Sequence, residues 1–396
     1  MATEELARRR HLTAALRRDE RVSSLELFFD LVFVLAITQC TQLMSEHPSW
    51  SGLGEGLLVL GVLWWSWVGY AWLTSVVDPE DDAVRLAIFV SMAALLLAAL
   101  AVPGAFGDLA LTFALAYGVV RVAHIGLFML GSSDDPNLRK SVIGLAGSTA
   151  AGVAILVVAS QLDGAAQGAA WALALALDMA GPFFFGSEGW KLVPAHFAER
   201  HGLILIIALG ESIVAIGVGV AGSLTFGQGV AAVVGIALAA ALWWLYFDVV
   251  ALVSARRLER APVGRQQNEM ARDSYSYLHF PMVAGIVLVA LALKKTLAHV
   301  GEDLSSVNAF ALLGGVALYL LALVAFRYRH IRSLNSRRTV LAVLALAFLP
   351  VATAIPALVS VSAVTLALWV LIVIETRSYG EGRTRVRHAD YAHDAG

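Results

Sequence analysis

The sequence predicts an all-α protein, a polytopic transmembrane helical bundle of about twelve spans arranged as two parallel six-helix repeats. Composition is the first reason, because 59% of the 396 residues are hydrophobic and only 15% are charged, whereas a soluble domain carries about a quarter charged residues. Long apolar runs recur along the chain, and the loops between them alternate between cation-rich and cation-free. The expected surroundings of the chain are therefore a lipid bilayer.

Each span is expected to be a helix of roughly 20 mostly apolar residues, the length that crosses about 30 Å of hydrocarbon. Only helices and closed barrels satisfy the backbone in lipid, and apolar runs without strict alternation indicate helices. Such runs lie near 24–44, 53–77, 84–105, 108–130, 140–162, 166–186, 201–221, 228–251, 275–298, 307–327, 338–354 and 356–376. The eleventh is short and contains Pro350.

The distribution of cations predicts the topology. Lys and Arg gather in the segment 1–22, in a polar tail over 377–396, and in loops near 131–140, 187–200, 252–274 and 328–338. The alternate loops, near 45–52, 103–107, 161–167, 222–227, 299–306 and 354–356, hold none. By the positive-inside rule the first set and both termini are cytoplasmic. The apolar run after the basic segment is too long for a signal-peptide core, so the first helix is expected to remain as an uncleaved anchor.

Internal similarity predicts two repeats, 23–186 and 187–376. The matches pair 113–119 with 310–316, 137–142 with 335–340, Asp178 with Glu375, and Trp64 and Trp65 with Trp243 and Trp244. Because each repeat contains six spans, the two halves are expected to run in the same sense, related by an axis along the membrane normal.

A first group of ionisable residues lies in the first and fourth runs. Glu26 and Asp30 share one helix face at i, i+4, where like charges repel unless one is protonated or a cation lies between them. Arg121 and His124, which share a face at i, i+3, are the expected partners. The group is interpreted either as a structural ion-pair cluster at a helix end or as a cytoplasmic gate that handles a proton or substrate.

A second group surrounds the seventh run. His196 and Glu199 share a face at i, i+3, but two ligands are a weak metal signal, and no metal site is predicted. Glu211 lies roughly 15–18 Å along the helix at a rise of about 1.5 Å per residue, near the bilayer midplane. A carboxyl at that depth is expected to be protonated or paired with a cation. It is either a proton or substrate site or a structural hydrogen-bonding group.

A third group lies at the two ends of the ninth run. Asp273, Tyr277 and His279 occupy its cytoplasmic end, and Lys294 and Lys295 its far end. These two lysines are the only cations expected in the outer half of the membrane. One lysine is expected to reach inward to an acid such as Glu211, while the other extends to the surface. The alternative is that both lysines extend to the surface.

Several classes of site are excluded by what the sequence lacks. The net charge of −2 does not suggest a nucleic-acid partner, and the one cysteine, Cys40, cannot form an internal disulfide or a thiolate metal cage. No nucleotide-binding loop, nucleophile elbow, zinc-protease helix or deaminase signature is present. No cofactor is therefore predicted.

Three motifs resemble the bacterial low-temperature-requirement protein A family, LtrA. They are the stretches 25–34 (LELFFDLVFV), 196–212 (HFAERHGLILIIALGES) and 272–279 (RDSYSYLH). The resemblance covers about 20–375, and nothing similar is known for the tail. It implies an integral membrane protein of bacterial type, hence of the cytoplasmic membrane, named for a growth phenotype in the cold. It implies no reaction and no catalytic residue.

The leading functional hypothesis is a proton-coupled secondary transporter or permease, because parallel repeats around midplane ionisable residues are a known transporter plan. Glu211 is the expected proton carrier, and the partner is a small-molecule solute or a lipid. An intramembrane enzyme acting by acid–base chemistry on a lipid or other hydrophobic substrate is the alternative. A structural membrane protein without turnover, its ionisable groups all paired, is a third possibility.

Overall fold

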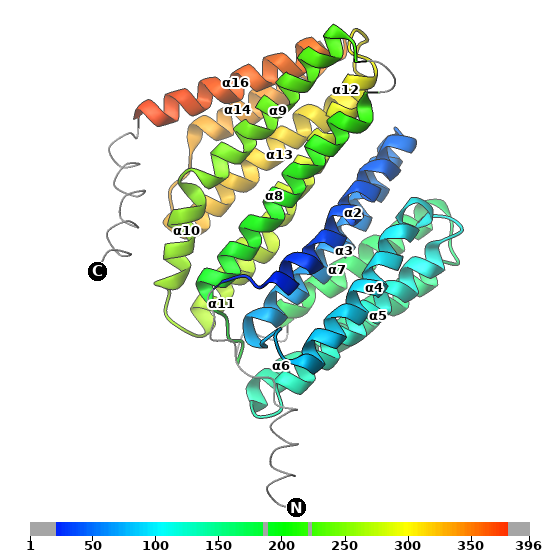
Figure 1. The fold of residues 1–396 in the computed structure, drawn as a ribbon, viewed down its shortest axis with the longest axis vertical. Helices are drawn as coiled ribbons and strands as arrows, with labels where there is room; N and C mark the ends of the chain where they lie inside the picture. Colours follow the sequence, from blue (N-terminus) through cyan, green and yellow to red (C-terminus); the bar gives the residue numbers. More distant parts are fainter. Residues whose placement is uncertain (1–20, 185–188, 221–223, 379–396) are drawn as a thin grey trace, which may run out of the picture. The chain divides into compact units, whose positions relative to one another are not determined.

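The computed structural model describes residues 21–184, 189–220 and 224–378. The all-α prediction is confirmed, since these described ranges contain helices and no strand. The principal helices, labelled in Figure 1, are α2 Ser24–Glu46, α3 Trp50–Val76, α4 Asp82–Ala101, α5 Ala110–Gly131, α6 Pro136–Ala159, α7 Gly164–Phe184, α8 Pro194–Gly219, α9 Phe226–Phe247, α10 Val250–Glu259, α11 Arg265–Ala271, α12 His279–Ala298, α13 Ser306–Ile331, α14 Ser336–Ala347, α15 Leu349–Ala352 and α16 Ala357–Ser378.

Within the described residues, ten helical segments are long and apolar enough to cross a membrane. The predicted run 166–186 coincides with α7 and the run 338–354 with α14 and α15, and none of these three helices is among the ten. In α14 and α15, Pro350 lies in the first turn of a new short helix, since proline has no backbone N–H to continue the preceding one. The chain is thus a multi-pass membrane protein, and a count of twelve spans stays a prediction.

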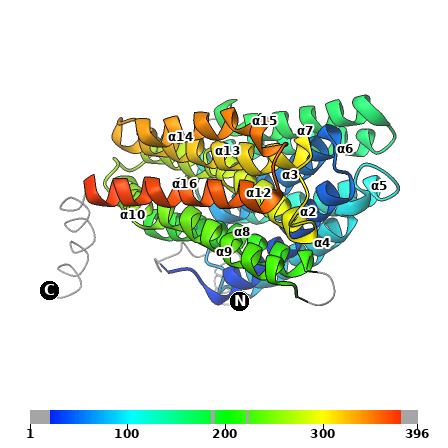
Figure 2. The ribbon, with the colours of Figure 1, turned by 90° about the horizontal axis from the view of Figure 1, so that it is seen from above.

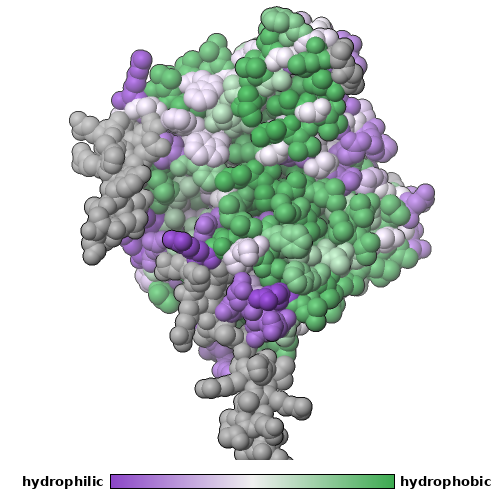
Figure 3. Space-filling view, in the orientation of Figure 1, coloured by the Kyte–Doolittle hydropathy of each residue, from purple (hydrophilic) through white to green (hydrophobic). Residues whose placement is uncertain are grey.

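Apolar side chains project outward along the helices. Phe226 is 90% exposed, Phe184 78% and Val122 74%. In Figure 3, hydrophobic residues cover most of the visible surface of the described helices. A water-soluble protein rarely exposes so much contiguous apolar surface, so these faces are the ones expected to contact lipid tails.

The chain divides into two compact units. Unit 1 comprises the described parts of Met1–Leu43, Gly54–Arg200 and Ala261–Glu269. Within it, α4 packs on α5, α5 on α6, and α6 on α7, so successive helices are neighbours (Figure 1). Short connections between antiparallel helices give this arrangement, and it places the inward faces of α5, α6 and α7 around a common interior.

Unit 2 comprises Met44–Leu53, His201–Arg260 and the described part of Met270–Gly396. Its most extensive packing is between α12 and α13, and α13 also packs on α14 (Figure 2). The first two helices approach at glycine: an added Cβ at Gly285 would lie 2.6 Å from the carbonyl oxygen of Gly315. Small residues permit such backbone contact between membrane helices.

Capping residues define several helix starts. Asp81 accepts hydrogen bonds from the first backbone N–H groups of α4, and Asp135 does so for α6, where Pro136 occupies the first helical position. Thr225 and Gln228 form a reciprocal capping box at α9. These side chains satisfy N–H groups that have no partner within the helix.

A π-helical segment, η2, covers Arg272–Tyr277 immediately before α12. Periodicity of apolar residues does not reveal such a segment, because one residue is inserted per turn without changing the composition. π-Helical turns occur frequently at functional sites. Here the segment carries two of the residues singled out in the sequence, Asp273 and Tyr277.

Candidate functional site

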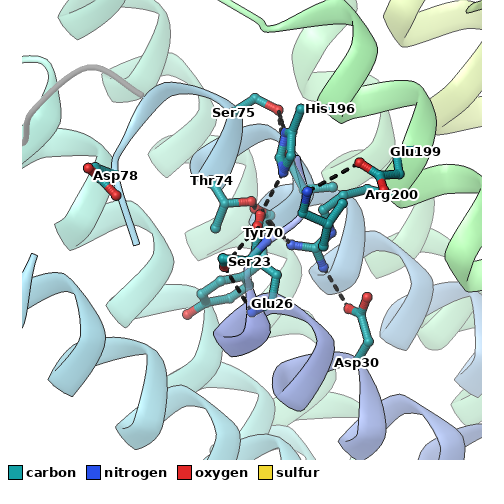
Figure 4. Close-up of polar contacts among 12 residues, drawn as sticks. Ser23, Glu26, Asp30, Tyr70, Thr74, Ser75, Asp78, His196, Glu199 and Arg200 are labelled. Atoms are coloured by element: carbon teal, nitrogen blue, oxygen red, sulfur yellow. Dashed lines mark hydrogen bonds and ion pairs between the residues drawn. The ribbon is translucent and has the colours of Figure 1, made fainter. Parts of the chain in front are cut away.

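Four buried ionisable side chains of unit 1 meet at the cytoplasmic end predicted for α2. We call Glu26, Asp30, His196 and Arg200 the Arg200 cluster; each is at most 2% exposed. The helix α2 supplies the two acids and α8 the two bases, and each pair is separated by one turn (Figure 4). Two i, i+4 pairs on facing helices therefore form one polar group.

Arg200 joins the two carboxylates. One terminal nitrogen donates to Glu26 Oε1 at 3.1 Å and to Thr74 Oγ1 at 3.2 Å, and the other donates to Asp30 Oδ1 at 2.6 Å. The guanidinium carbon lies 5.5 Å from the centre of the Trp67 ring. A buried arginine with charged partners and an aromatic face has the surroundings that this side chain requires away from water.

His196 is a further hydrogen-bonding partner of Glu26. Its Nε2 lies 2.9 Å from Glu26 Oε1, and its Nδ1 lies 3.2 Å from the Ser75 hydroxyl. That hydroxyl also lies 2.9 Å from the Ala71 carbonyl oxygen. The second carboxylate oxygen of Glu26 accepts from the backbone N–H and the hydroxyl of Ser23 (Figure 4). Both Glu26 oxygens therefore have donors.

Asp30 is less completely satisfied than Glu26. Its Oδ1 accepts from Arg200 and, at 2.9 Å, from the indole N–H of Trp67. Its Oδ2 is buried without a hydrogen-bond partner in the described structure. A buried carboxylate oxygen without a donor is costly, and such an atom marks a place where a proton or a ligand group would be stabilised.

A second ion pair lies in the same unit. Arg121 on α5 donates to Asp178 Oδ1 on α7 at 2.8 Å and to the Thr149 hydroxyl on α6 at 2.7 Å. Thr149 and Tyr117 also donate to Asp178, at 2.9 Å each. Three helices are thus joined through one carboxylate.

These contacts correct the expected pairing of the first group. Arg121 binds Asp178 and does not ion-pair with Glu26 or Asp30; Arg200 takes that place. His124 is buried, and neither of its ring nitrogens has a hydrogen-bond partner among the described residues. The expected pairing of Arg121 and His124 with the acids of α2 is wrong, because the i, i+3 spacing defined a shared face but not the helix opposite it.

The predicted midplane acid of unit 2 is buried. Glu211 is 3% exposed, and its charge acts on Lys294. The neighbouring Lys295 donates from Nζ to the Ser45 carbonyl oxygen at 2.9 Å. Lys294 therefore lies close enough for its charge to interact with that of Glu211, and Lys295 contacts the end of α2.

The remaining residues of the third group are in three different surroundings. Asp273 pairs with Arg272 and, at 3.1 Å, with Arg329. His279 is buried, with Nε2 2.9 Å from the Tyr246 hydroxyl and Nδ1 3.1 Å from the Ser274 carbonyl oxygen. Since the carbonyl can only accept, His279 carries its proton on Nδ1 and is occupied on both sides. Tyr277 is partly exposed on η2.

Glu199 lies outside the Arg200 cluster, although it precedes Arg200 in the sequence. Its carboxylate accepts from the Val22 backbone N–H at 3.2 Å. No group of three or more His, Cys, Asp or Glu side chains within the described ranges is arranged to hold a metal. His196 and Glu199 therefore contact different partners: His196 contacts Glu26, and Glu199 accepts from Val22.

Sequence reasoning missed two arginine partners. Asp178 was noted only as a repeat match, yet it and Arg121 are charges within apolar runs, and two opposite charges at such depth indicate a pair. In unit 2, Arg338 forms a fork with both oxygens of Glu375, at 3.0 and 2.8 Å. Asn335 donates to the same carboxylate at 2.7 Å.

Comparison with known proteins is consistent with the sequence motifs. The model of a bacterial family, the low temperature requirement A proteins (LtrA), matches residues 21–373. An uncharacterized protein of Rhizobium meliloti (strain 1021) is 30% identical over 308 residues, which are 74% of this chain and 74% of that protein. No solved structure matches.

Proposed function

Because this chain belongs to the LtrA family of bacterial membrane proteins, we propose that it is a proton-coupled secondary transporter or permease of the cytoplasmic membrane, with both termini in the cytoplasm. The Arg200 cluster is its proton-exchange site. The single observation that carries the proposal is the hydrogen-bond pattern around His196.

That pattern allows a proton on each imidazole nitrogen. The hydroxyl of Ser75 lies 2.9 Å from the Ala71 carbonyl oxygen, which only accepts, so it can donate its one hydrogen there. With that hydrogen so placed, the hydroxyl accepts from Nδ1–H of His196, and Nε2–H donates to Glu26. We propose that His196 is an imidazolium in this state, and that the neutral ring, with the Ser75 hydroxyl turned to donate to Nδ1, is the state after proton release.

The charge of the four side chains supports a bound proton in the cluster. With both carboxylates ionised, Glu26 and Asp30 contribute two negative charges and Arg200 one positive charge. One proton, on His196 or on the unpartnered Oδ2 of Asp30, brings the sum to zero, and its loss leaves a net negative charge in a buried place, which is costly. The cluster therefore holds a proton whose release changes its stability.

The consequence for transport is mechanical. Both bases belong to α8 and both acids to α2, so the attachment of one helix to the other depends on the proton. Proton-coupled alternating access requires a contact between helices that is stable in one protonation state and weakened in the other. Glu211 and Lys294 are proposed as a second acid–base pair, in unit 2, with Tyr277 and Asp273 near the predicted cytoplasmic entrance.

We also propose that the two predicted repeats, 23–186 and 187–376, are the halves that move. The support is that each ends in an apolar helix carrying one carboxylate bound by arginine: Asp178 by Arg121, and Glu375 by Arg338. Domain arrangements with parallel repeats recur among transporters.

The test uses proteoliposomes with a trapped pH-sensitive dye and a panel of amino acids, carboxylic acids and nucleobases. Glu26→Gln removes the carboxylate that holds the proton on His196 while keeping the side-chain shape. We expect solute to move down its own gradient but no longer to be driven by a pH gradient. Glu80→Gln, at an exposed site bonded to Arg85, is the matched control and should remain coupled.

Solute uptake by Glu26→Gln that is still driven by a pH gradient would remove the assigned role. The second candidate function is an intramembrane enzyme, favoured by His330, which is buried beside Tyr275 and Phe326 with both ring nitrogens unpartnered among the described residues. Conversion of a lipid by the purified protein, with no solute movement, would support that alternative.

A further inference from the structure

A cavity of about 290 Å³ lies within unit 2, and no residue of the Arg200 cluster lines it. Its walls come from the end of α9, the start of α10, and the ends of α13, α14 and α16 that adjoin the predicted cytoplasmic loops. Much of the lining is aliphatic, including Leu245, Val253 and Ile372. A cavity of this size is near the lower end of small-molecule sites, which are about 300–1,000 Å³, so it fits a headgroup and a few carbons.

One ion pair in the wall is closed to an additional ligand. Arg338 donates from Nε and one terminal nitrogen to Glu375, and from its other terminal nitrogen to the Leu245 carbonyl oxygen at 3.1 Å. Glu375 also accepts from Asn335. The pair sums to zero charge, and its donors and acceptors are used within the protein.

The other arginine in the wall is differently placed. Arg327 forms no ion pair or hydrogen bond within the described residues, and its Nε is buried without a partner. Asp248, the remaining acid of the wall, has interactions of its own. The charge of Arg327 acts on Glu375 at a distance, but its planar set of donors is not used by any group among the described residues.

We propose that this cavity binds an anionic amphiphile, with its phosphate or carboxylate on the guanidinium of Arg327 and its first carbons against the aliphatic wall. Arginine suits this role because its fork of N–H groups matches the oxygens of both anions. The level of the cavity supports a membrane source, since the surrounding helix ends adjoin the predicted cytoplasmic loops, where lipid headgroups lie. The site is independent of the proposed transport function.

The experiment measures binding to the full chain in detergent by native mass spectrometry and isothermal calorimetry. The probes are dihexanoyl phosphatidylglycerol, octyl phosphate, octanoate, inorganic phosphate and dihexanoyl phosphatidylcholine. We expect the first three to bind and inorganic phosphate and the zwitterionic lipid to bind at least about tenfold more weakly. Phosphatidylglycerol binding more tightly than octyl phosphate and octanoate would identify a lipid headgroup as the source, and the reverse order a free amphiphilic acid.

The variant Arg327→Gln should weaken binding of the anionic probes by about tenfold or more, the loss of one charge-assisted contact. Arg332→Gln is the control, because Arg332 is an exposed arginine at the C-terminal end of the same helix, α13, that stacks on Tyr328 and does not line the cavity. If Arg327→Gln fails to fold, Arg327→Lys serves in its place: it keeps the charge but loses the fork of N–H groups, so it should bind the anionic probes more weakly than the unaltered protein.

Three results would overturn the proposal. The first is equal affinity of the unaltered protein and a folded Arg327→Gln for octyl phosphate. The second is inorganic phosphate binding as tightly as octyl phosphate, because the aliphatic wall would then contribute nothing. The third is equal binding of phosphatidylcholine and phosphatidylglycerol, because the site would then not select a net anion.

Discussion

The arginine–carboxylate pairs of the two units are buried to different extents. In unit 1 the side chains of Arg121 and Arg200 are each 1% exposed, and their carboxylate partners are no more than 4% exposed. In unit 2 the side chains of Arg338 and Glu375 are 7% and 13% exposed and line a cavity. Charges with no access to water depend entirely on one another, whereas charges beside a cavity are partly screened.

The completeness of hydrogen bonding also differs between the arginine–carboxylate pairs of the two units. In unit 1, Asp30 Oδ2 and the Nε atoms of Arg121 and Arg200 are buried without partners in the described structure. In unit 2, Arg338 uses Nε and both terminal nitrogens. A buried polar group without a partner lowers the stability of the fold. The contrast between the pairs is therefore what the proposed roles require: proton exchange at the Arg200 cluster and a structural role for Arg338 and Glu375.

The largest effect expected from this comparison is on folding stability. Arg200→Gln leaves Glu26 and Asp30 buried beside each other and should destabilise the protein by about 3–5 kcal/mol. Arg338→Gln should cost less, about 1–3 kcal/mol, because water in the adjoining cavity can reach Glu375.

Thermal unfolding in detergent, followed by circular dichroism, checks this order. The reactivity of the Cys40 thiol toward a thiol reagent is a local probe, because Cys40 is fully buried in unit 1. Arg85→Gln, which breaks an exposed ion pair in unit 1, should change stability by no more than about 1 kcal/mol. Equal losses for Arg200→Gln and Arg338→Gln would contradict the contrast between the two units.

A smaller difference in stability is expected when a glycine at a helix–helix contact is replaced in each unit. Gly285→Ala places a methyl group against the backbone of α13, which cannot move aside, and should cost about 1–3 kcal/mol. Gly118→Ala in unit 1 meets only Cγ1 of Val153, at 3.2 Å, and that side chain can rotate. Its stability should be nearly unchanged. The paired unfolding midpoints test this, and a loss for Gly118→Ala as large as that for Gly285→Ala would refute it.

The sequence was sufficient for the helices because each is specified locally. Hydrophobic length alone predicts α2 through α6, and their observed bounds lie within a few residues of the predicted runs. The partner of Glu26 was not predictable in this way. Spacing shows that His196 and Arg200 share a face, but which helix that face meets depends on helix rotation and on contacts 170 or more residues apart.

Burial of Glu211 followed from its depth in an apolar run, a local property. The lack of a hydrogen-bond partner for Nε of Arg327 could not be predicted from a local property. It depends on the fact that Arg338 already binds the carboxylate of Glu375. The π-helical turn at Arg272–Tyr277 likewise depends on tertiary packing that overrides the usual helical period.

The smallest expected effect contrasts two helix caps. Asp135, outside the spans, accepts from the backbone N–H groups of Leu138 and Asn137 and pairs with Lys191 at 3.2 Å. The hydrogen bond from Leu138, followed by that from Lys191, holds the pKa of this carboxyl below its ordinary value despite partial burial. Ser305, the cap of α13 in unit 2, is neutral.

A depressed pKa in the folded state means that Asp135 stabilises the protein above its unfolded pKa of about 4. That contribution is lost as the pH falls through the folded value. Asp135→Asn keeps the cap but removes the charge, so it should cost about 0.3–1 kcal/mol at pH 7, and the cost should fade below about pH 4. Ser305→Ala should instead lower the unfolding midpoint equally across that range, because no proton is bound or released at its cap. A cost of Asp135→Asn that stays constant from pH 7 to pH 3 would show that the charge of Asp135 does not stabilise α6.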